Sequence, residues 1–298
     1  MNRFPDHARV CFVGDSITHV NGYLIRIVSH YKKNYPDSNI NFYNCGIAGA
    51  NLDEQLKIFE ADTLSYNPTH IVMMIGINDS GREGLLSPRS VERYEYFKRS
   101  FERYKKNLST ICDAFKSKGV DITLCTCIPY DEYGDYCTAP LRGGLSLIMS
   151  YNEYIRKYAA ENGFALCDYF PYMIEHMQTR CLYNADGVHP NDLGNYYIAK
   201  CFLAHQGLTM ENDDFSNKLQ EWNACVLKIR DILAFEYIVL KDHSMSYDEG
   251  AKIADAFLKD ENNKTETYLC RLSEIYLHHK PNQSDIRRRM IELMEKEL

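Results

Sequence analysis

The sequence predicts an α/β fold, in which a parallel sheet is covered by helices on both faces, followed by an all-helical extension. Through the first two thirds of the chain, short apolar runs alternate with longer amphipathic segments. Strands and helices that alternate with short connections build βαβ units, which assemble into parallel sheets. After about residue 210 the β-rich runs disappear, which places a domain boundary between residues 1–208 and 209–298.

Five strands are expected, because five short runs rich in β-branched and aromatic residues end at turn-forming residues. One of them, residues 70–75 (HIVMMI), is apolar throughout, as is typical of a strand buried on both faces of a parallel sheet. The expected strands are residues 9–13, 39–43, 70–75, 121–128 and 164–167.

The segments between these strands have the periodicity of amphipathic helices. Apolar residues recur every three or four positions, as Leu24, Ile27 and Tyr31 do after the first strand. A short helix is expected after the turn that follows the second strand, and the last helix of the main domain is expected after the fifth strand. The expected helices are residues 17–34, 52–59, 91–118, 147–161 and 193–205.

The extension contains an apolar stripe that needs a partner. Its members follow one another at intervals of 3-4-3-4, as on one face of a helix. Further helices are expected at 247–259, at 266–279 and near the C-terminus. The stripe can pack on the main domain of the same chain, or on a second copy across a two-fold axis, which would make a homodimer. The stripe residues are Leu219, Trp222, Val226, Ile229 and Leu233. We expect Trp222 to be buried in either case, and a dedicated recognition module is the alternative role for the segment.

Composition excludes several classes of protein. The 298 residues carry a net charge of −7, with a pI near 5.8, which argues against a nucleic-acid or acidic-membrane partner. No apolar run approaches the roughly 20 residues that span a bilayer. The eleven cysteines are scattered, several within apolar runs, which suits reduced thiols. Because the N-terminal segment also lacks the apolar core of a signal peptide, we expect a cytoplasmic protein.

Candidate functional residues follow the strands, where ligands bind in open α/β sheets. Ser16 comes after the first strand on a tight turn into a helix, so its hydroxyl is expected to be exposed and its N–H to lie at a helix N-terminus. Asn78 follows the third strand, where a side-chain amide can stabilise an oxyanion. Each also has a structural interpretation, namely helix capping for Asp15 or Ser16 and an Asx-turn for Asn78.

Two further elements complete the pattern. Asp186 and His189 lie on one turn before the last helix of the main domain, where the carboxylate can orient the imidazole as a general base. After the second strand, Gly46 and Gly49 permit positive φ angles and close approach of the backbone to a ligand. A single Asp-x-x-His pair is more often structural, and a single glycine turn is ordinary. Four such elements in this order are much harder to attribute to coincidence.

In order and spacing, these blocks resemble those of the SGNH (GDSL-type) hydrolases. The matching segments are GDSIT at 14–18, the turn at 44–49, GIND at 76–79 and DGVH at 186–189, and the resemblance covers about residues 8–206. It implies a flavodoxin-like three-layer αβα fold with a five-stranded parallel sheet. It also implies a serine esterase that needs no metal or organic cofactor. The extension is not part of the family core.

The resemblance also assigns roles to the residues. Ser16 would be the nucleophile, His189 the general base and Asp186 the residue that orients it. The N–H groups of Ser16 and Gly49 and the Asn78 amide would form the oxyanion hole. Gly49 is preferred because the family's glycine lies five residues after the asparagine that ends the strand, and Gly46 is the alternative.

The substrate is less well defined by the sequence. Tyr130, Tyr133 and Tyr136 lie with acidic residues in the loop after the fourth strand, a composition that suits sugar binding as well as an ordinary solvated loop. We take Asp15, Tyr130 and Tyr133 as candidate substrate contacts. A carbohydrate O-acetylesterase ranks first, and a lysophospholipase or thioesterase second. A non-catalytic carbohydrate-binding protein and a flavin- or phosphate-binding protein are the rivals from other classes.

Metal binding is not expected. The sequence has no HExxH motif and no paired Cys-x-x-Cys, and its ten histidines are dispersed. Cys125 and Cys127 are two positions apart in an expected strand, so they share one face and are interpreted as core residues.

Overall fold

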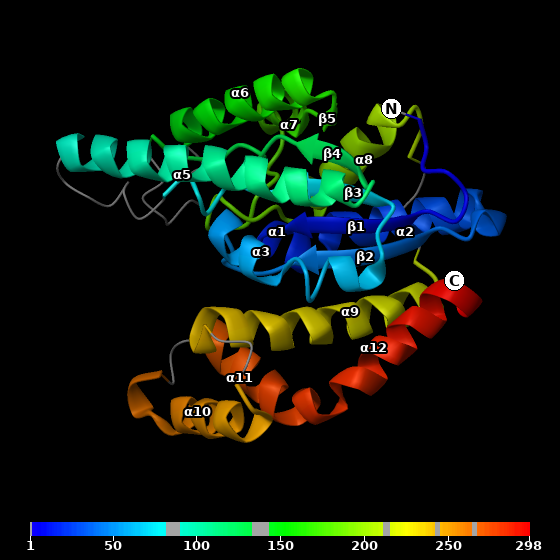
Figure 1. The fold of residues 1–298 in the computed structure, drawn as a ribbon, viewed down its shortest axis with the longest axis vertical. Coiled ribbons are helices and arrows are strands. Elements are labelled where there is room, and N and C mark those ends of the chain that lie inside the picture. Colours follow the sequence, from blue (N-terminus) through cyan, green and yellow to red (C-terminus); the bar gives the residue numbers. More distant parts are fainter. Residues whose placement is uncertain (1, 82–89, 133–142, 211–214, 242–244, 264–266) are drawn as a thin grey trace.

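The computed structural model describes residues 2–81, 90–132, 143–210, 215–241, 245–263 and 267–298. Its centre is a five-stranded sheet in the order β2-β1-β3-β4-β5, with all neighbouring strands parallel (Figure 1). The strands are β1 (Arg9–Gly14), β2 (Asn41–Gly46), β3 (His70–Met74), β4 (Asp121–Cys125) and β5 (Ala165–Cys167). The predicted α/β fold with a five-stranded parallel sheet is therefore confirmed.

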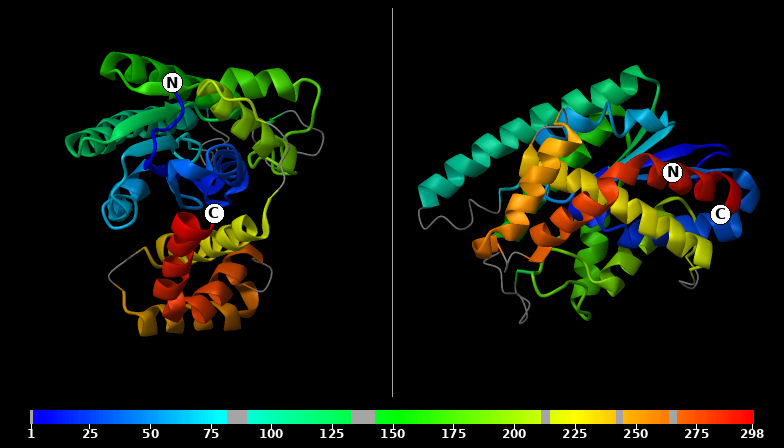
Figure 2. Two further views of the ribbon diagram at one scale, coloured as in Figure 1. Left: turned by 90° about the vertical axis from the view of Figure 1, so that its right-hand side faces the viewer. Right: turned by 90° about the horizontal axis from the view of Figure 1, so that it is seen from below.

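Helices cover both faces of this sheet (Figure 2). On one face, α2 (Gly22–Asn34) packs against α8 (Asp192–His205), beside α7 (Tyr169–Met177). The other face carries α3 (Leu52–Ile58), α5 (Ser90–Ser117) and α6 (Gly144–Asn162). The strands are buried almost throughout, since in β1 only Arg9 is partly exposed. Two covered faces explain why the strands are continuously apolar rather than alternating.

The boundaries differ from the prediction at several places in the main domain. The strand expected over 121–128 ends at Cys125, so Cys127 lies beyond it, and the strand expected over 39–43 is Asn41–Gly46. The helix expected over 17–34 is two helices, α1 (Ser16–His19) and α2, because Asn21 between them adopts a left-handed conformation with φ 60°. Asparagine tolerates this conformation better than most residues. Helix α7 was not predicted; it begins at Tyr169, one residue after β5 ends, with Asp168 at its N-cap position.

The extension folds back onto the main domain of the same chain. It consists of α9 (Asn217–Phe235), the π-helix η3 (Glu236–Leu240), α10 (Tyr247–Lys259), α11 (Thr267–His279), α12 (Gln283–Glu292) and the π-helix η6 (Leu293–Glu297). Helix α9 runs beside the edge strand β2 (Figure 1). Trp222 has 0% exposure, so its predicted burial is confirmed. All five stripe residues are buried within one chain. The homodimer stays a prediction, but the stripe is not free to form its interface.

A buried ion pair ties the extension to the main domain. Arg230 of α9 donates two hydrogen bonds to Asp62, with distances of 2.6 and 2.8 Å. Burial raises the pKa of Asp62, but the guanidinium groups of Arg230 and Arg287 outweigh it and hold the pKa below its ordinary value. Breaking such a pair leaves an uncompensated buried charge, so the pair fixes the position of α9 on the sheet. No helix in the described ranges has the length and apolar character needed to cross a membrane.

Candidate active site

Ser16 is the first residue of α1, directly after β1. Asp15 caps this helix, because its carboxylate accepts a hydrogen bond from the Ile17 N–H at 3.0 Å. Gly14 is required before it, since a Cβ there would lie 2.7 Å from the Met74 carbonyl oxygen. Asp15 is 1% exposed, so its role is capping, and its prediction as a substrate contact is wrong. The Ser16 side chain is left partly exposed at the carboxyl edge of the sheet.

Ser16, His189 and Asp186 form a continuous hydrogen-bonded chain. The Ser16 Oγ lies 2.8 Å from His189 Nε2, and His189 Nδ1 lies 2.5 Å from Asp186 Oδ2. The other Asp186 oxygen accepts the backbone N–H groups of Val188 and His189, both at 2.9 Å. A proton on Nδ1 is favoured by the carboxylate, which leaves Nε2 as the acceptor for the serine hydroxyl. The arrangement can therefore deprotonate Ser16.

The Asp186 carboxylate is held in its charged form. Partial burial raises its pKa, but hydrogen bonds from the His189 side chain and from the His189 and Val188 backbone outweigh burial and hold the pKa well below its ordinary value. The Asp186 side chain is 41% exposed and the His189 side chain 33% exposed. A negative charge beside the imidazole stabilises the imidazolium that forms when His189 takes a proton.

Hydrogen-bond donors face this region from two other loops. The Asn78 Nδ2 donates to the Ala50 carbonyl oxygen at 2.9 Å, which fixes the amide and leaves its second hydrogen for a ligand. Gly49 has φ +78° and an exposed backbone, and its N–H has no acceptor among the residues that the structure describes. In contrast, the Gly46 N–H donates to Asn44 Oδ1 at 2.8 Å. Gly49 is thus the better candidate for the oxyanion hole.

The extension contacts the main domain directly behind the serine turn through His19, which the sequence analysis did not single out. Its Nε2 lies 2.8 Å from Asp231 Oδ1 of α9, and its Nδ1 accepts the Ala48 N–H at 3.4 Å. Burial lowers the pKa of His19, although Asp231 acts in the opposite direction. A neutral His19 ring is consistent with the hydrogen bond from the Ala48 N–H, because Nδ1 can accept this bond only when it carries no proton. His19 therefore connects α9 to the residue that precedes Gly49.

A second connection runs through three asparagines. Asn223 of α9 accepts a hydrogen bond from Asn21 at 2.7 Å, and Asn21 accepts one from Asn44 at 2.9 Å. Asn44 also donates to the Thr18 carbonyl oxygen at 2.7 Å. The motif segments are therefore held in place by α9 as well as by the sheet.

Asp79 holds the loop that carries Gly49 against the end of β3. Both of its carboxylate oxygens lie 3.2 Å from the Leu52 N–H, at the first turn of α3. Asp79 is 2% exposed, and burial raises its pKa to about 7, although the Leu52 hydrogen bond acts against this. It follows Asn78 in the sequence, so it links the two predicted oxyanion-hole segments.

Tyr130, one of the tyrosines predicted to bind substrate, lies in the core beneath the Asn78 segment. Tyr130 is 1% exposed, and its hydroxyl donates to the Ile77 carbonyl oxygen at 3.0 Å and lies 3.0 Å from Ser80 Oγ. It is a core residue that supports the Asn78 segment, so its prediction as a substrate contact is wrong. Tyr133 and Tyr136 lie outside the described residues. Within the described part of the chain, no cluster of three His, Cys, Asp or Glu side chains can hold a metal ion.

A serine made nucleophilic by a histidine, beside donors for an oxyanion and above a parallel sheet, is the chemistry of a serine-type acyl hydrolase. The chain belongs to the GDSL-like Lipase/Acylhydrolase family, whose sequence profile matches residues 12–196. It is a carboxylic ester hydrolase on the SGNH scaffold.

Similar proteins agree with this class. An acetylxylan esterase from Geobacillus stearothermophilus is 27% identical over 218 residues, which cover 67% of this chain and 94% of that protein. The structure of Axe2, an acetylxylan esterase from the same organism, matches with a TM-score of 0.58 at 21% identity, covering 70% of this chain and 99% of its own. BT4096, a gut microbial diltiazem-metabolizing enzyme, matches with a TM-score of 0.81 at 17% identity, covering 99% of this chain and 95% of its own. The last match includes the extension, so the fold of the whole chain occurs in another protein.

Proposed function

We propose that the protein hydrolyses short-acyl esters, of the acetyl type, on acylated carbohydrates, through an acyl-serine intermediate. The observation that carries the esterase chemistry is the chain of hydrogen bonds from Ser16 to His189 to Asp186, at 2.8 and 2.5 Å. The acetyl group and the carbohydrate are supported by the relative named acetylxylan esterase, which covers 67% of this chain.

The proposed reaction has two halves. In the first, His189 Nε2 accepts the hydroxyl proton of Ser16 as Oγ attacks the ester carbonyl. The tetrahedral oxyanion accepts hydrogen bonds from the Ser16 and Gly49 N–H groups and from the Asn78 amide. Collapse breaks the bond to the alcohol oxygen, and His189 gives this alcohol its proton. In the second half, His189 deprotonates a water molecule as its oxygen attacks the acyl-serine. The bond from the carbonyl carbon to Ser16 Oγ then breaks, Oγ takes the proton back from His189, and the acid leaves.

The cytoplasmic location is also a proposal. Its support is the state of the cysteines, since the ten that the structure describes are all free and six of them are buried. Free thiols in this number are typical of a reducing compartment.

The test is a substrate series with a matched inactive protein. Hydrolysis rates are measured on p-nitrophenyl esters from acetate to octanoate, and acetate release is then measured on acetylated xylo-oligosaccharides. We expect the highest kcat/KM on acetate among the p-nitrophenyl esters, acetate release from the oligosaccharide, and neither activity in Ser16→Ala. A preference for octanoate would favour a lysophospholipase or thioesterase, and an unchanged rate in Ser16→Ala would overturn the mechanism.

A further inference from the structure

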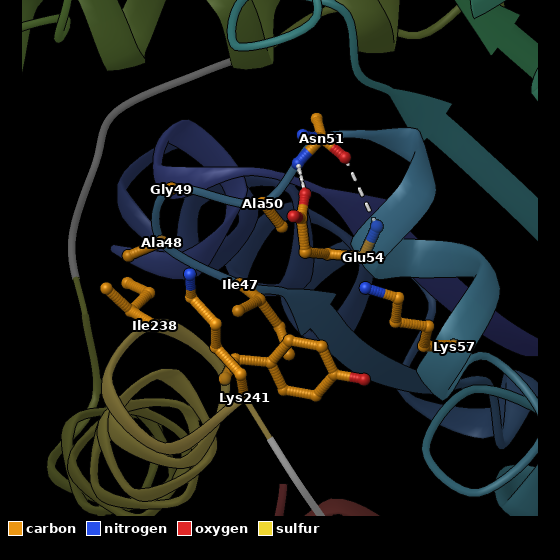
Figure 3. A pocket seen from close by; sticks show the side chains of 10 residues that line it. Ile47, Ala48, Gly49, Ala50, Asn51, Glu54, Lys57, Ile238 and Lys241 are labelled. Carbon is orange, nitrogen blue, oxygen red and sulfur yellow. Dashed lines mark hydrogen bonds between the residues drawn. The ribbon is translucent and has the colours of Figure 1, made fainter. Parts of the chain in front are cut away.

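A pocket of about 650 Å³ lies between the loop that carries Gly49 and the π-helix η3 of the extension (Figure 3). The main domain contributes residues 47–51 together with Glu54 and Lys57, and the extension contributes Tyr237, Ile238 and Lys241. The Ile238 side chain lies over Gly49, since a Cβ on that glycine would be 3.3 Å from Ile238 Cδ1. The pocket therefore borders the backbone that is proposed to bind the ester oxyanion.

The floor of the pocket is apolar and its walls carry positive charge. Ile47, Ala48, Ala50 and Ile238 form the apolar part. Lys57 comes from α3 and Lys241 from the end of η3, and Figure 3 shows their amino groups directed into the space between the two elements. An apolar floor with a small number of charged groups is typical of a ligand pocket.

The carboxylate that lines the pocket, Glu54, forms no ion pair with either lysine. Glu54 Oε2 accepts the Asn51 N–H at 2.8 Å, as part of the capping box that starts α3. Among the residues that the structure describes, neither Lys57 nor Lys241 has an acidic side chain within ion-pair distance. The Glu54 carboxylate keeps its charge while it accepts the Asn51 N–H, so the pocket lining carries two lysines and one carboxylate, in a chain whose net charge is −7. Two lysines without an acidic partner in such a lining favour an anion.

We infer that this pocket binds an anionic group of the substrate, a carboxylate, sulfate or phosphate, through Lys57 and Lys241. This inference rests on the proposed function, because the anion is taken as part of the ester whose carbonyl lies at Gly49. The anion can belong to the acyl part or to the alcohol part of that ester. Since Lys241 belongs to the extension, this segment contributes to substrate choice, although it lies outside the residues that the family profile matches.

The test compares each anionic ester with its methyl ester, which lacks the charge. For an anion on the alcohol, 4-acetoxybenzoate is compared with its methyl ester. For an anion on the acyl part, mono-4-nitrophenyl succinate is compared with its methyl ester. The quantity measured is the ratio of kcat/KM for the charged and neutral member of each pair, because a general loss of activity cancels in this ratio. The variants are Lys57→Gln, Lys241→Gln and the double variant, and the control is Lys118→Gln, in the turn between α5 and the amino end of β4.

We expect the wild-type protein to prefer the charged member of one pair, and that pair identifies the side of the ester that carries the anion. Each lysine variant should lower the preference about tenfold, and the double variant should abolish it. The preference should also fall with added salt, whereas Lys118→Gln should keep it. Equal or better hydrolysis of the neutral member in both pairs would overturn the inference, as would an unchanged preference in the double variant.

A binding measurement separates this inference from the proposed function. Calorimetric titration of Ser16→Ala with 4-acetoxybenzoate and with the succinate monoester requires no turnover. Binding that Lys57→Gln and Lys241→Gln weaken would support the pocket even if no ester were hydrolysed. Binding that is independent of both lysines, or no binding of either anion, would overturn it even if the esterase activity were established.

Discussion

Ser16 contributes its hydroxyl to the hydrogen bond with His189 and little to packing, since its side chain is partly exposed at the sheet edge. We therefore expect Ser16→Ala to lower the hydrolysis rate of p-nitrophenyl acetate by about 10⁴-fold or more, and to shift Tm by no more than about 2 °C. Initial rates and a thermal melt on the same preparation measure both. Ser109→Ala, which removes a hydroxyl from α5, is the control and should keep full activity. If Ser16→Ala keeps most of the rate, Ser16 is not the nucleophile.

Asp186 is expected to matter through its charge. Asp186→Asn keeps the shape of the side chain but removes the charge that stabilises the His189 imidazolium, so kcat should fall by about 10³- to 10⁴-fold. Because the folded-state pKa of Asp186 lies below its ordinary value, its charge adds stability above about pH 4. This stability is lost as the pH falls through the folded-state pKa. Melts of both proteins between pH 2 and 7 should show a difference in Tm that closes at the acidic end. A difference independent of pH would contradict this assignment.

The effect of Asp79 on the pH dependence of stability should be opposite to that of Asp186. Its pKa is raised to about 7 in the folded protein, so between about pH 4 and pH 7 the unfolded chain loses a proton that the folded protein keeps. Stability therefore falls as the pH rises through this window. Asp79→Asn keeps an acceptor for the Leu52 N–H and does not titrate. We expect the free energy of unfolding of Asp79→Asn, relative to wild type, to rise by up to about 4 kcal/mol across the window. Denaturant melts at pH 4.5, 6 and 7.5 measure it, and a constant difference would show that Asp79 is charged in the folded state.

Among the individual residues, the three that form the Ser16–His189–Asp186 hydrogen bonds were predictable from the sequence. The residues that hold these three in place were not. The sequence predicted Ser16, Asp186 and His189 because each lies in a short motif at the end of a strand or before a helix, positions that the fold class brings together. The bond between His19 and Asp231 joins residues 212 positions apart, and no local pattern pairs them. Tyr130 was misassigned because an aromatic residue in a polar loop gives no sign that its hydroxyl reaches a backbone carbonyl in the core.

Among the elements, α9 has the widest effect on the site, because it is hydrogen-bonded to His19 and Asn21 after the serine turn, and His19 in turn accepts the Ala48 N–H. Its periodicity predicted the helix and its apolar face. The π-helix η3 that follows was not predicted, since its residues continue the helical pattern and only the backbone hydrogen bonds distinguish it. Yet η3 supplies Ile238 above Gly49. Helical periodicity alone therefore could not predict that η3 forms one wall of the pocket.

The contact of α9 with His19 can be tested by two replacements at Asp231. Asp231→Ala removes the acceptor for the His19 ring. Because this leaves a buried N–H unsatisfied, it should lower the free energy of unfolding by about 1–3 kcal/mol, and kcat on p-nitrophenyl acetate should fall about tenfold, because the 47–50 loop loses a support. Asp231→Asn keeps an oxygen at this place and should restore most of kcat. Lys228→Gln, on the exposed face of the same helix, should change neither quantity. An equal loss of kcat in the Asn and Ala variants would show that the hydrogen bond to His19 does not position the loop.

For the molecule as a whole, the extension completes the core rather than forming a separate body. The side chains of Leu219, Trp222 and Val226 belong to the same apolar cluster as the sheet, and Met290 and Leu293 join them from the C-terminal end. A second cluster joins Ile47, Ala48 and Ala50 to η3 and α11. The boundary near residue 208 therefore marks a change in architecture, and the two parts share one interior.

Removing residues 209–298 should therefore expose the edge of the sheet. The shortened protein keeps every motif of the family but loses the cover over β2 and the 47–50 loop, and a patch of this extent favours aggregation. We expect a low yield of soluble protein and a kcat/KM on p-nitrophenyl acetate at least about tenfold below that of the full chain. Static light scattering of the full chain, run as the reference, also tests the predicted homodimer, since a mass near 34.7 kDa would exclude it at the concentration used. A soluble, fully active 1–208 fragment would show that the extension neither completes the core nor supports the site.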